Sequence, residues 1–373
     1  MTVLVSAGRV FAPEGTIVGG AVMIEDGRLT AVGPRAAMTA PAGAREQDWG
    51  EAALAPGLVD IHVHGGAGLD FMSADAAGVH AVARHLARHG VTSFCATTVT
   101  AAWSEVLAAV ERLALAGCDI HLEGPFLSRE RRGVHPEAEL LAPTLERLEA
   151  LWERSRGRLR IITLAPELDG ALEFIAAARA RGIIVALGHS DASAAQTLAA
   201  VQAGATHVTH AFNAMRPLHQ REPGLLGVAL TEPGLTVDVI ADGHHVDPRL
   251  VAMLWRLAAR QRTVLISDAI SATGCPEGEY ALGGITVAVA GGRCLAGGRL
   301  AGSVLTLDRA VGNFMNFTGC DLATAWNLAS GNPARAAGLN QKGQLCAGAD
   351  ADLVVLSQAG AVQAVYVAGQ QLD

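Results

Sequence analysis

The 373-residue sequence predicts an α/β fold, a TIM-type (β/α)8 barrel with a small β-sandwich domain built from both chain termini. Between residues 58 and 269, eight short apolar runs alternate with stretches of helical character, which is the pattern of a parallel barrel. β-like segments lie on both sides of this region, so the barrel interrupts a domain whose two parts come from the ends of the chain. A doubly wound open sheet is the alternative arrangement.

The first 55 residues have the pattern of short strands separated by turns. Asp26-Gly27, between VMIE and RLTAV, is a strong signal for a two-residue hairpin. We expect 1–55 and 343–373 to form the composite β-sandwich domain and 56–342 to form the barrel domain. The short apolar or alternating runs are 3–5, 9–11, 21–25 and 28–32.

The pattern changes at Pro56-Gly57, where the barrel strands begin. Several of the strand candidates are near-continuous Val, Ile and Leu runs, as buried parallel strands usually are. The strand candidates are 58–64, 92–98, 118–124, 159–167, 182–190, 206–212, 235–243 and 262–269. The helices predicted between them include 74–89, 101–116, 144–155, 168–181, 191–203 and 248–260.

The chain beyond the eighth strand continues with mixed structure. A Gly-rich, β-like stretch covers 283–302, and helices are predicted at 303–316 and 321–338. The final segment, ADLVVLSQAGAVQAVYVAGQQL, returns to a strand pattern with turns at Gly360 and Gly369.

Composition excludes several classes of protein. Half of the residues are apolar and 17% are charged, which fits a globular enzyme and not a disordered chain. A net charge of −8 gives no basic footprint for nucleic acid. We expect no signal peptide and no membrane span, since the sequence lacks a basic start and any apolar run of about 18 residues. None of the six cysteines forms a Cys-x-x-Cys pair, which favours reduced thiols in a cytoplasmic protein.

Lysine is almost absent from the chain. Lys342 is the only lysine among 28 basic residues, and it lies far from every candidate site residue. Catalysis through a lysine Schiff base, or phosphate binding by a P-loop lysine, is therefore close to excluded.

Potential metal ligands fall at the ends of the predicted strands. Barrel enzymes carry their active sites at the carboxyl ends of the strands, so these side chains should meet in one pocket. Residues i and i+2 of a strand face the same side, so both histidines of His-x-His can reach one ion. The candidate ligands are His62, His64, Glu123, His189, His210 and Asp268.

Two of the strand-end residues suggest the chemistry. Asp268 is placed to act as a general base toward a metal-activated water and then to protonate a leaving group. His245 is placed across the pocket to polarise a substrate carbonyl. A buried Glu123 is costly without a partner, and a cation supplies one. The sequence has neither the Gly-x-Ser-x-Gly of a serine hydrolase nor the Gly-x-Gly-x-x-Gly of a dinucleotide-binding fold.

The whole layout resembles the amidohydrolase superfamily. Many members carry a carboxylated lysine on the fourth barrel strand, and the fourth predicted strand here (159–167) has no lysine. The third predicted strand (118–124) offers Glu123 instead, and this combination is similar to the N-acetylglucosamine-6-phosphate deacetylase family. The blocks HLEGPF, HAFNAM, REPG and ADGHHV occur in that family's order. The resemblance covers about residues 50–340.

The resemblance implies a metal site and a catalytic pair. Glu123, His189 and His210 match the shared metal site, while His62 and His64 imply a second ion, with Asp268 as a further ligand and Glu123 as a bridge. Zinc is the first expectation for the metal, and iron, manganese or cobalt fit the same ligands. Asp268 matches the family's general acid/base, and His245 matches its carbonyl-polarising histidine.

The resemblance also implies the substrate, a sugar phosphate. The expected reaction hydrolyses N-acetylglucosamine 6-phosphate to glucosamine 6-phosphate and acetate, in amino-sugar catabolism or cell-wall recycling. Arg221 matches an arginine that reaches the phosphate from the neighbouring subunit, which implies a homodimer. The residues assigned to substrate binding are Val134, His135, Asn213, Ala214, Arg221, Asp242, His245, Leu300, Ala301 and Gly302.

Two other functions remain open from the residues alone. A different amidohydrolase, acting on a non-phosphorylated amide, would not need Arg221. A non-catalytic metal-binding barrel is disfavoured by Asp268, since a protein without turnover has no need of a proton carrier. Neither nucleic acid nor a membrane is expected as a partner.

Overall fold

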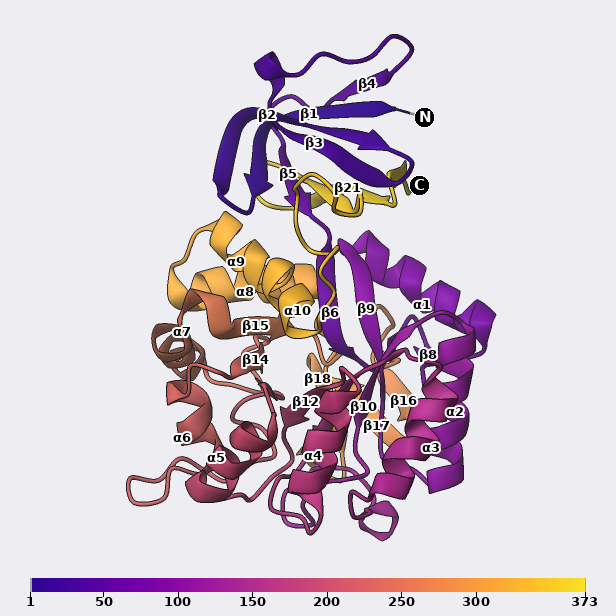
Figure 1. Ribbon diagram of the computed structural model, residues 1–373, viewed down its shortest axis with the longest axis vertical. Coiled ribbons are helices and arrows are strands. Elements are labelled where there is room, and N and C mark those ends of the chain that lie inside the picture. Colours follow the sequence, from indigo (N-terminus) through magenta and orange to yellow (C-terminus); the bar gives the residue numbers. More distant parts are fainter. Residues whose placement is uncertain (1, 373) are drawn as a thin grey trace.

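The computed structural model describes residues 2–372 and contains a (β/α)8 barrel with a smaller β domain at one end (Figure 1). The barrel strands are parallel and neighbour one another in chain order. The ring closes between its last and first strands, where Asp268 N donates to His62 O at 3.0 Å and His64 N donates to Ala269 O at 2.8 Å. This closure confirms the barrel and makes the open sheet wrong.

The eight barrel strands coincide with the eight predicted runs, although most are shorter. In order they are β6 (Leu58–Val63), β9 (Val91–Thr98), β10 (Asp119–Glu123), β11 (Leu159–Leu164), β12 (Ile184–Leu187), β13 (His207–Val208), β14 (Thr236–Ile240) and β15 (Thr263–Ile266). A short hairpin of β7 (Gly65–Gly66) and β8 (Leu69–Asp70) follows β6.

The helices that surround the barrel confirm the predicted βα alternation. They are α1 (Ala76–Arg88), α2 (Trp103–Leu115), α3 (Leu145–Ser155), α4 (Ala171–Ala180), α5 (Ala194–Ala203), α6 (Gly224–Thr231), α7 (Pro248–Arg262) and α8 (Leu307–Thr318). The helical segment predicted at 321–338 is confirmed, although it is divided into α9 (Leu322–Leu328) and α10 (Gly331–Ala336). Short 3-10 turns lie at η1 (Arg35–Ala37) and η2 (Glu137–Glu139).

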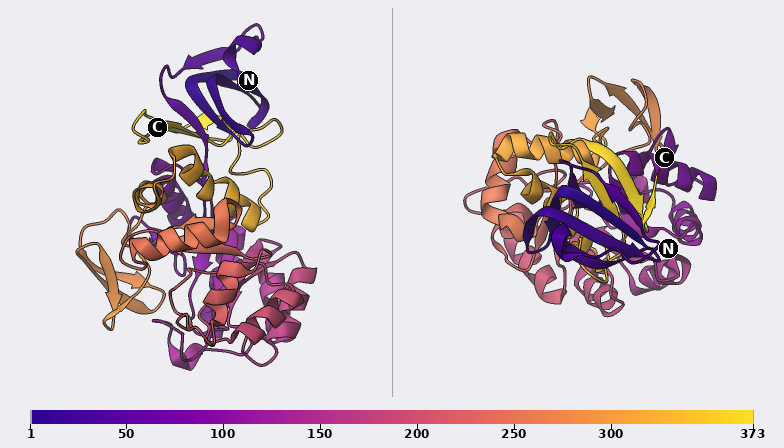
Figure 2. Two further views of the ribbon diagram at one scale, coloured as in Figure 1. Left: turned by 90° about the vertical axis from the view of Figure 1, so that its left-hand side faces the viewer. Right: turned by 90° about the horizontal axis from the view of Figure 1, so that it is seen from above.

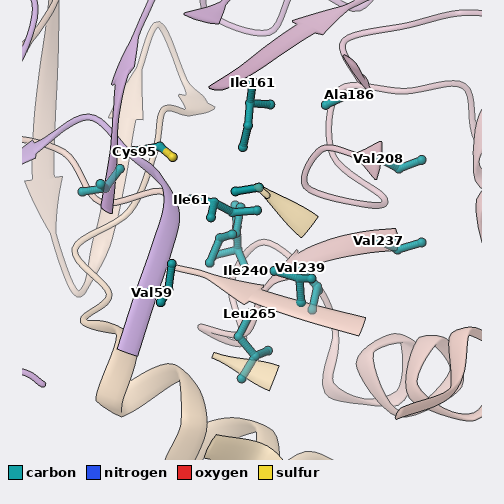
Figure 3. Close-up of a cluster of buried hydrophobic side chains, with 14 of the residues drawn as sticks. Val59, Ile61, Cys95, Ile161, Ala186, Val208, Val237, Val239, Ile240 and Leu265 are labelled. Carbon is teal, nitrogen blue, oxygen red and sulfur yellow. The ribbon is translucent and has the colours of Figure 1, made fainter. Parts of the chain in front are cut away.

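The main apolar core lies between the barrel strands and the surrounding helices. Figure 3 shows side chains of this core from strands all around the ring, including Ile61, Ile161 and Leu265. These residues are fully buried or nearly so. Alternation along a strand then turns the neighbouring positions, such as His62 on β6, toward the barrel interior.

The small domain is one sheet made from both ends of the chain. The order β22-β21-β20-β5-β1-β2-β3, with β4 beside β1, brings the C-terminal strands next to the N-terminal ones. A separate apolar core fills this domain. We propose the division into 1–55 plus 343–373 and 56–342. The strands are β1 (Val3–Ala12), β2 (Gly15–Glu25), β3 (Arg28–Pro34), β4 (Arg45–Asp48), β5 (Ala53–Pro56), β20 (Leu353–Leu356), β21 (Val362–Val367) and β22 (Gln370–Gln371).

The predicted Asp26-Gly27 hairpin is confirmed between β2 and β3, where Glu25 pairs with Arg28. Both turn residues have positive φ, 48° and 78°, as a two-residue type I′ turn requires. The two runs predicted at 3–5 and 9–11 prove to be one continuous strand, β1.

A four-stranded antiparallel sheet projects from the side of the barrel after β15 (Figure 2). It starts earlier than the predicted 283–302 stretch. Its first turn, Gly283-Gly284, joins two strands whose ends face the barrel mouth. The strands are β16 (Gly278–Leu282), β17 (Ile285–Ala290), β18 (Arg293–Ala296) and β19 (Arg299–Leu300).

The two ends of the barrel have different neighbours. β5 leads directly into β6, so the amino end of β6 faces the small domain and the carboxyl ends of the strands face away from it (Figure 1). The candidate site therefore lies at the end of the barrel remote from both termini. Among residues 2–372, no helix is long and apolar enough to cross a membrane.

Candidate metal centre and active site

Six buried side chains meet at the carboxyl ends of the barrel strands. They form two groups, in each of which the possible ligand atoms lie within 4.8 Å of one another. The residues are the six named as candidate ligands from the strand ends, and the two groups are those that the family resemblance implied. The first group is His62, His64 and Asp268, and the second is Glu123, His189 and His210.

Glu123 lies between the two groups. Its Oε1 is 3.2 Å from His189 Nε2 and 3.1 Å from His210 Nε2. The same Oε1 is 3.4 Å from His62 Nε2, and Oε2 is 3.4 Å from His64 Nε2. One carboxylate thus reaches both sets of imidazoles, which is the arrangement required of a bridging ligand.

The spacing of the donor atoms fits a divalent cation. The Nε2 atoms of His189 and His210 are 3.0 Å apart, and those of His62 and His64 are 3.1 Å apart. Two ligands at about 2.0–2.1 Å from a tetrahedral zinc lie about 3.3 Å apart, so each pair could share one ion. Nitrogen and carboxylate donors of this kind suit zinc and several other divalent metals.

The outer ring nitrogens hold two of the histidines in the tautomer that a metal needs. His189 Nδ1 donates to the carbonyl of Arg131 at 3.0 Å, and His64 Nδ1 donates to that of Thr97 at 3.2 Å. A carbonyl can only accept, so each Nδ1 carries the proton and each Nε2 is left to bind an ion.

Without a metal ion, a protonated histidine supplies the positive charge beside the carboxylates of the centre. Burial lowers the pKa of His64, but hydrogen bonds with Asp268 and Glu123 raise it to about 10. Burial raises the pKa of Glu123, whereas the imidazoles around it, His62 foremost, hold it well below its usual range. Glu123 therefore stays ionised, and a cation would compete with protons for these ligands.

Three of the site residues have an unusual backbone conformation. His189, His210 and Asp268 have φ values of 47°, 32° and 49°. Non-glycine residues enter this left-handed region at a cost of roughly 1–3 kcal/mol and stay there only when their surroundings hold them. The ends of β12, β13 and β15 are thus bent to aim these side chains at the centre.

A cavity of about 200 Å³ opens beside the ligands. It is lined by five of the six candidate ligand residues, and the sixth, His62, is fully buried and does not line it. All but two of the residues predicted to bind substrate line it as well. Those that line it are Val134, His135, Asn213, Ala214, His245, Leu300, Ala301 and Gly302.

Gly302 leaves room beside Asp268. Its φ is +60°, and a Cβ there would lie 3.0 Å from Asp268 O and 2.3 Å from Ile270 Cγ2. Only glycine fits this position without displacing the end of β15. Ser303 N then donates to Asp268 O at 2.7 Å, which ties this segment to the strand.

Asp242 contacts His245 and does not line the cavity, which differs from its predicted part in substrate binding. Its Oδ2 accepts from His245 Nδ1 at 2.7 Å. Its Oδ1 accepts from the backbone N–H groups of His244 and His245, both at 2.8 Å. Burial raises the pKa of Asp242, but the hydrogen bond and charge of His245 outweigh it and lower that pKa.

The comparisons with known proteins agree with this geometry. The model of the amidohydrolase family matches residues 53–372. The chain is 42% identical over 351 residues to human N-acetylglucosamine-6-phosphate deacetylase, covering 87% of this chain and 84% of the human protein. This chain belongs to the N-acetylglucosamine-6-phosphate deacetylase family of amidohydrolases.

Other members match over nearly the whole length. N-acetylgalactosamine-6-phosphate deacetylase of Escherichia coli O157:H7 is 38% identical, covering 99% of both chains. A Mycobacterium smegmatis N-acetyl-D-glucosamine-6-phosphate deacetylase mutant, solved in complex with N-acetyl-D-glucosamine-6-phosphate, superposes with a TM-score of 0.94 at 37% identity, covering 99% of both chains. The enzyme from Thermotoga maritima gives 0.88 at 30% identity, again over 99% of both.

Arg221 lies apart from the two candidate ligand groups of this chain. It is exposed in the connection between β13 and α6, and it does not line the cavity. Within residues 2–372 no ion pair is recorded for it, because the neighbouring Glu222 accepts instead from the backbone of Ala194 and Gly224. Its guanidinium is thus available to another molecule.

The sequence did not single out several cavity residues. Leu282 and Ile285 come from the projecting sheet and flank the Gly283-Gly284 turn. The Gly-Gly pair was a readable hairpin signal, but only the tertiary structure shows that the turn reaches the cavity. The others missed are Val99, Gly133 and Ile240.

Proposed function

We propose that this chain is a metal-dependent deacetylase that hydrolyses N-acetylglucosamine 6-phosphate to glucosamine 6-phosphate and acetate. The observation that carries the proposal is the position of Asp268, which lines the same cavity as the Glu123 ligand group and the residues that match the family's sugar site. Relatives that bear this activity in their names are similar over most of the chain.

The metal ligands would be the two groups that share Glu123. A divalent ion held there would polarise the acetamide carbonyl and make water a stronger nucleophile at neutral pH. Asp268 takes the proton of the attacking water on its carboxylate and passes it to the departing amine. Its Oδ1 lies 3.1 Å from His64 Nε2, so the base sits directly beside the ligands.

His245 binds the substrate carbonyl from the other side of the cavity. Because Asp242 accepts from Nδ1, only Nε2 faces the cavity. To donate to a carbonyl, Nε2 must also carry a proton, so the ring is doubly protonated when it acts. The ionised Asp242 stabilises that imidazolium, and we assign it this orienting part in place of direct substrate contact.

Replacing Asp242 by asparagine should lower kcat by about a hundredfold, since a single oxyanion donor is worth about that factor or more. The amide keeps the size of the carboxylate but no longer stabilises a protonated His245. Metal content should not change. Acetate release and bound metal are measured together. The control is Asp247→Asn, because in the described part of the chain that carboxylate bonds only to Arg249. A kcat within threefold of the wild type would remove Asp242 from this part.

We also propose that the active enzyme is a homodimer in which Arg221 reaches the substrate phosphate bound by the partner. Three properties support it: the exposure of Arg221, its lack of an ion pair within residues 2–372, and its position in the REPG block. A guanidinium can hold two phosphate oxygens at once.

Replacing Arg221 by alanine should raise KM for the phosphorylated sugar by about tenfold to a hundredfold, because one or two charge-assisted hydrogen bonds contribute about that factor to binding. Hydrolysis of unphosphorylated N-acetylglucosamine should not change. Steady-state kinetics with both sugars test this, and Arg154→Ala, which removes a surface pair with Glu111, is the control. Equal losses with both sugars would contradict phosphate binding by Arg221.

We propose zinc as the metal, on the strength of the tetrahedral spacing of nitrogen donors, with iron, manganese and cobalt as substitutes. All six cysteines are unpaired, which supports a reducing compartment such as the cytoplasm. We place the reaction in amino-sugar catabolism or cell-wall recycling, where N-acetylated sugar phosphates are consumed.

The first test compares acetate release from N-acetylglucosamine 6-phosphate and from N-acetylglucosamine, with zinc or iron supplied. A large preference for the phosphorylated sugar supports the proposal, and equal rates or no release from either contradict it. N-acetylgalactosamine 6-phosphate is the second candidate substrate, because the relative similar over 99% of both chains is named for that sugar. A higher kcat/KM for the galactose epimer would transfer the assignment to it.

A further inference from the structure

A cluster of charged residues outside the cavity joins the loops that carry the metal ligands. Asp191 lies in the loop after β12, two residues beyond His189. Its Oδ1 accepts from Arg131 Nε at 2.8 Å, and its Oδ2 accepts from Arg216 Nη2 at 2.6 Å. Arg131 belongs to the loop after β10 and Arg216 to the loop after β13, so one carboxylate links three loops.

A fourth loop joins through Glu167, which follows β11. Glu167 Oε1 accepts from Asp191 N at 2.6 Å, and Oε2 accepts from Ser190 Oγ at 2.7 Å. Both Asp191 and Glu167 thus use both carboxylate oxygens. The mechanism above uses none of these charged side chains, and they lie outside the cavity lining.

The cluster acts on His189 through the main chain of Arg131. The carbonyl of Arg131 accepts from His189 Nδ1 and so keeps Nε2 free for an ion. The segment around Arg131 is irregular, so the position of this carbonyl depends on how the Arg131 side chain is anchored. The backbone N–H of Arg131 donates to Ser128 O at 3.1 Å, and its side chain is anchored by Asp191.

The cluster acts on His210 through Arg216. Between them the chain is bent, with φ of 32° at His210, 76° at Phe212 and 48° at Ala214. Such a run persists only when its surroundings hold it. Arg216 fixes its far end, because its N–H donates to Ser190 O at 3.0 Å and its guanidinium is held by Asp191.

We propose that Asp191 is a positioning residue of the metal centre. By holding Arg131 and Arg216 together it keeps His189 and His210 in the geometry that binds the ion. The inference rests on the metal centre of the proposed function, but it adds a residue that touches neither metal nor substrate. An isolated surface ion pair contributes little to stability, so a role of this kind must appear in metal affinity and not in stability alone.

The test measures zinc binding by the ion-free protein in competition with a chelator, with no substrate present. His64→Asn is introduced in every protein, so that the group of Glu123, His189 and His210 is the one observed. Asp191→Ala is compared with Glu149→Ala, which removes an equal charge and the Arg181–Glu149 pair, 2.6 Å long, on the outside of the barrel. Thermal unfolding of the ion-free proteins reports any general loss of stability.

We expect Asp191→Ala to bind zinc about tenfold more weakly, the lower end of what outer partners of metal ligands contribute. Asp191→Asn can still accept hydrogen bonds at one oxygen, so its zinc affinity should fall between those of Asp191→Ala and the parent. Glu149→Ala should bind zinc as tightly as the parent. Unfolding midpoints of the ion-free variants should agree within a few degrees.

Three results would overturn the proposal. Zinc affinities of Asp191→Ala and Glu149→Ala within twofold of each other would contradict it while leaving the proposed function intact. If the zinc affinity of Asp191→Ala fell only together with its thermal unfolding midpoint, Asp191 would have a purely structural part. A parent protein that binds no zinc would contradict the proposed function and this inference together.

Discussion

Replacing Glu123 by glutamine should leave the protein without bound metal and reduce acetate release by at least about a thousandfold. Among residues 2–372, Glu123 is the one side chain whose carboxylate reaches both ligand groups, with Oε1 3.1 Å from His210 Nε2 and Oε2 3.4 Å from His64 Nε2. Glutamine has the same shape but carries no charge. The loss of an ion's charge stabilisation is worth several kcal/mol in the transition state, and each 1.36 kcal/mol is tenfold in rate.

Metal content is measured by mass spectrometry after dialysis, alongside turnover of N-acetylglucosamine 6-phosphate. The matched control is Glu137→Gln, since Glu137 lies on the rim and pairs only with Arg129 and Arg132 in the described chain. It should keep the wild-type metal content and rate. If Glu123→Gln retained a full complement of metal, Glu123 would not be the bridge.

The barrel could be predicted because its elements carry their own signals. Each buried strand is an apolar run, and most outer helices have one apolar face, as α1 and α3 do. The outer helix that was not among the predicted ones is α6. Its sequence GLLGVALT is apolar almost all round and mostly buried, so it lacks the 3.6-residue period that marks a surface helix.

The ligand set was readable because strand ends in a closed barrel converge. The position of His62 and His64 on one face follows from alternation alone. By contrast, nothing in the local sequence tells that His189, His210 and Asp268 adopt positive φ, since this conformation is uncommon for any non-glycine residue. These bends depend on contacts between distant loops.

Contacts across loops are also why the sequence did not indicate the bond of Asp242 to His245 or the ion pairs of Asp191. Asp242 lies in a block that resembles a substrate-binding motif, yet its carboxylate is used up by His244 and His245. Asp191 gains its partners from segments 60 residues before it and 25 residues after it. A pairing of this kind requires the folded barrel and has no periodic signature.

Replacing Asp268 by asparagine should lower kcat by about a hundredfold to ten-thousandfold, the usual worth of a general acid/base. Asparagine tolerates the left-handed conformation that Asp268 adopts at φ 49°, so the end of β15 should keep its shape. In the ion-free protein, burial raises the pKa of Asp268, but the hydrogen bond of His64 and the charge of His62 lower it to about 2. The carboxylate is therefore ionised at neutral pH, and an amide cannot accept the proton that it would take.

Asp268 has two proposed parts, as a ligand of the His62–His64 group and as the proton carrier, and a comparison with His64→Asn separates them. Both variants remove one ligand from the same group, in which Asp268 Oδ1 lies 3.1 Å from His64 Nε2. Metal at Glu123, His189 and His210 should persist in both. If Asp268 only binds metal, the two variants should lose activity equally. If it carries the proton, Asp268→Asn should be slower than His64→Asn by at least about tenfold at equal metal content, because proton transfer alone contributes a hundredfold or more.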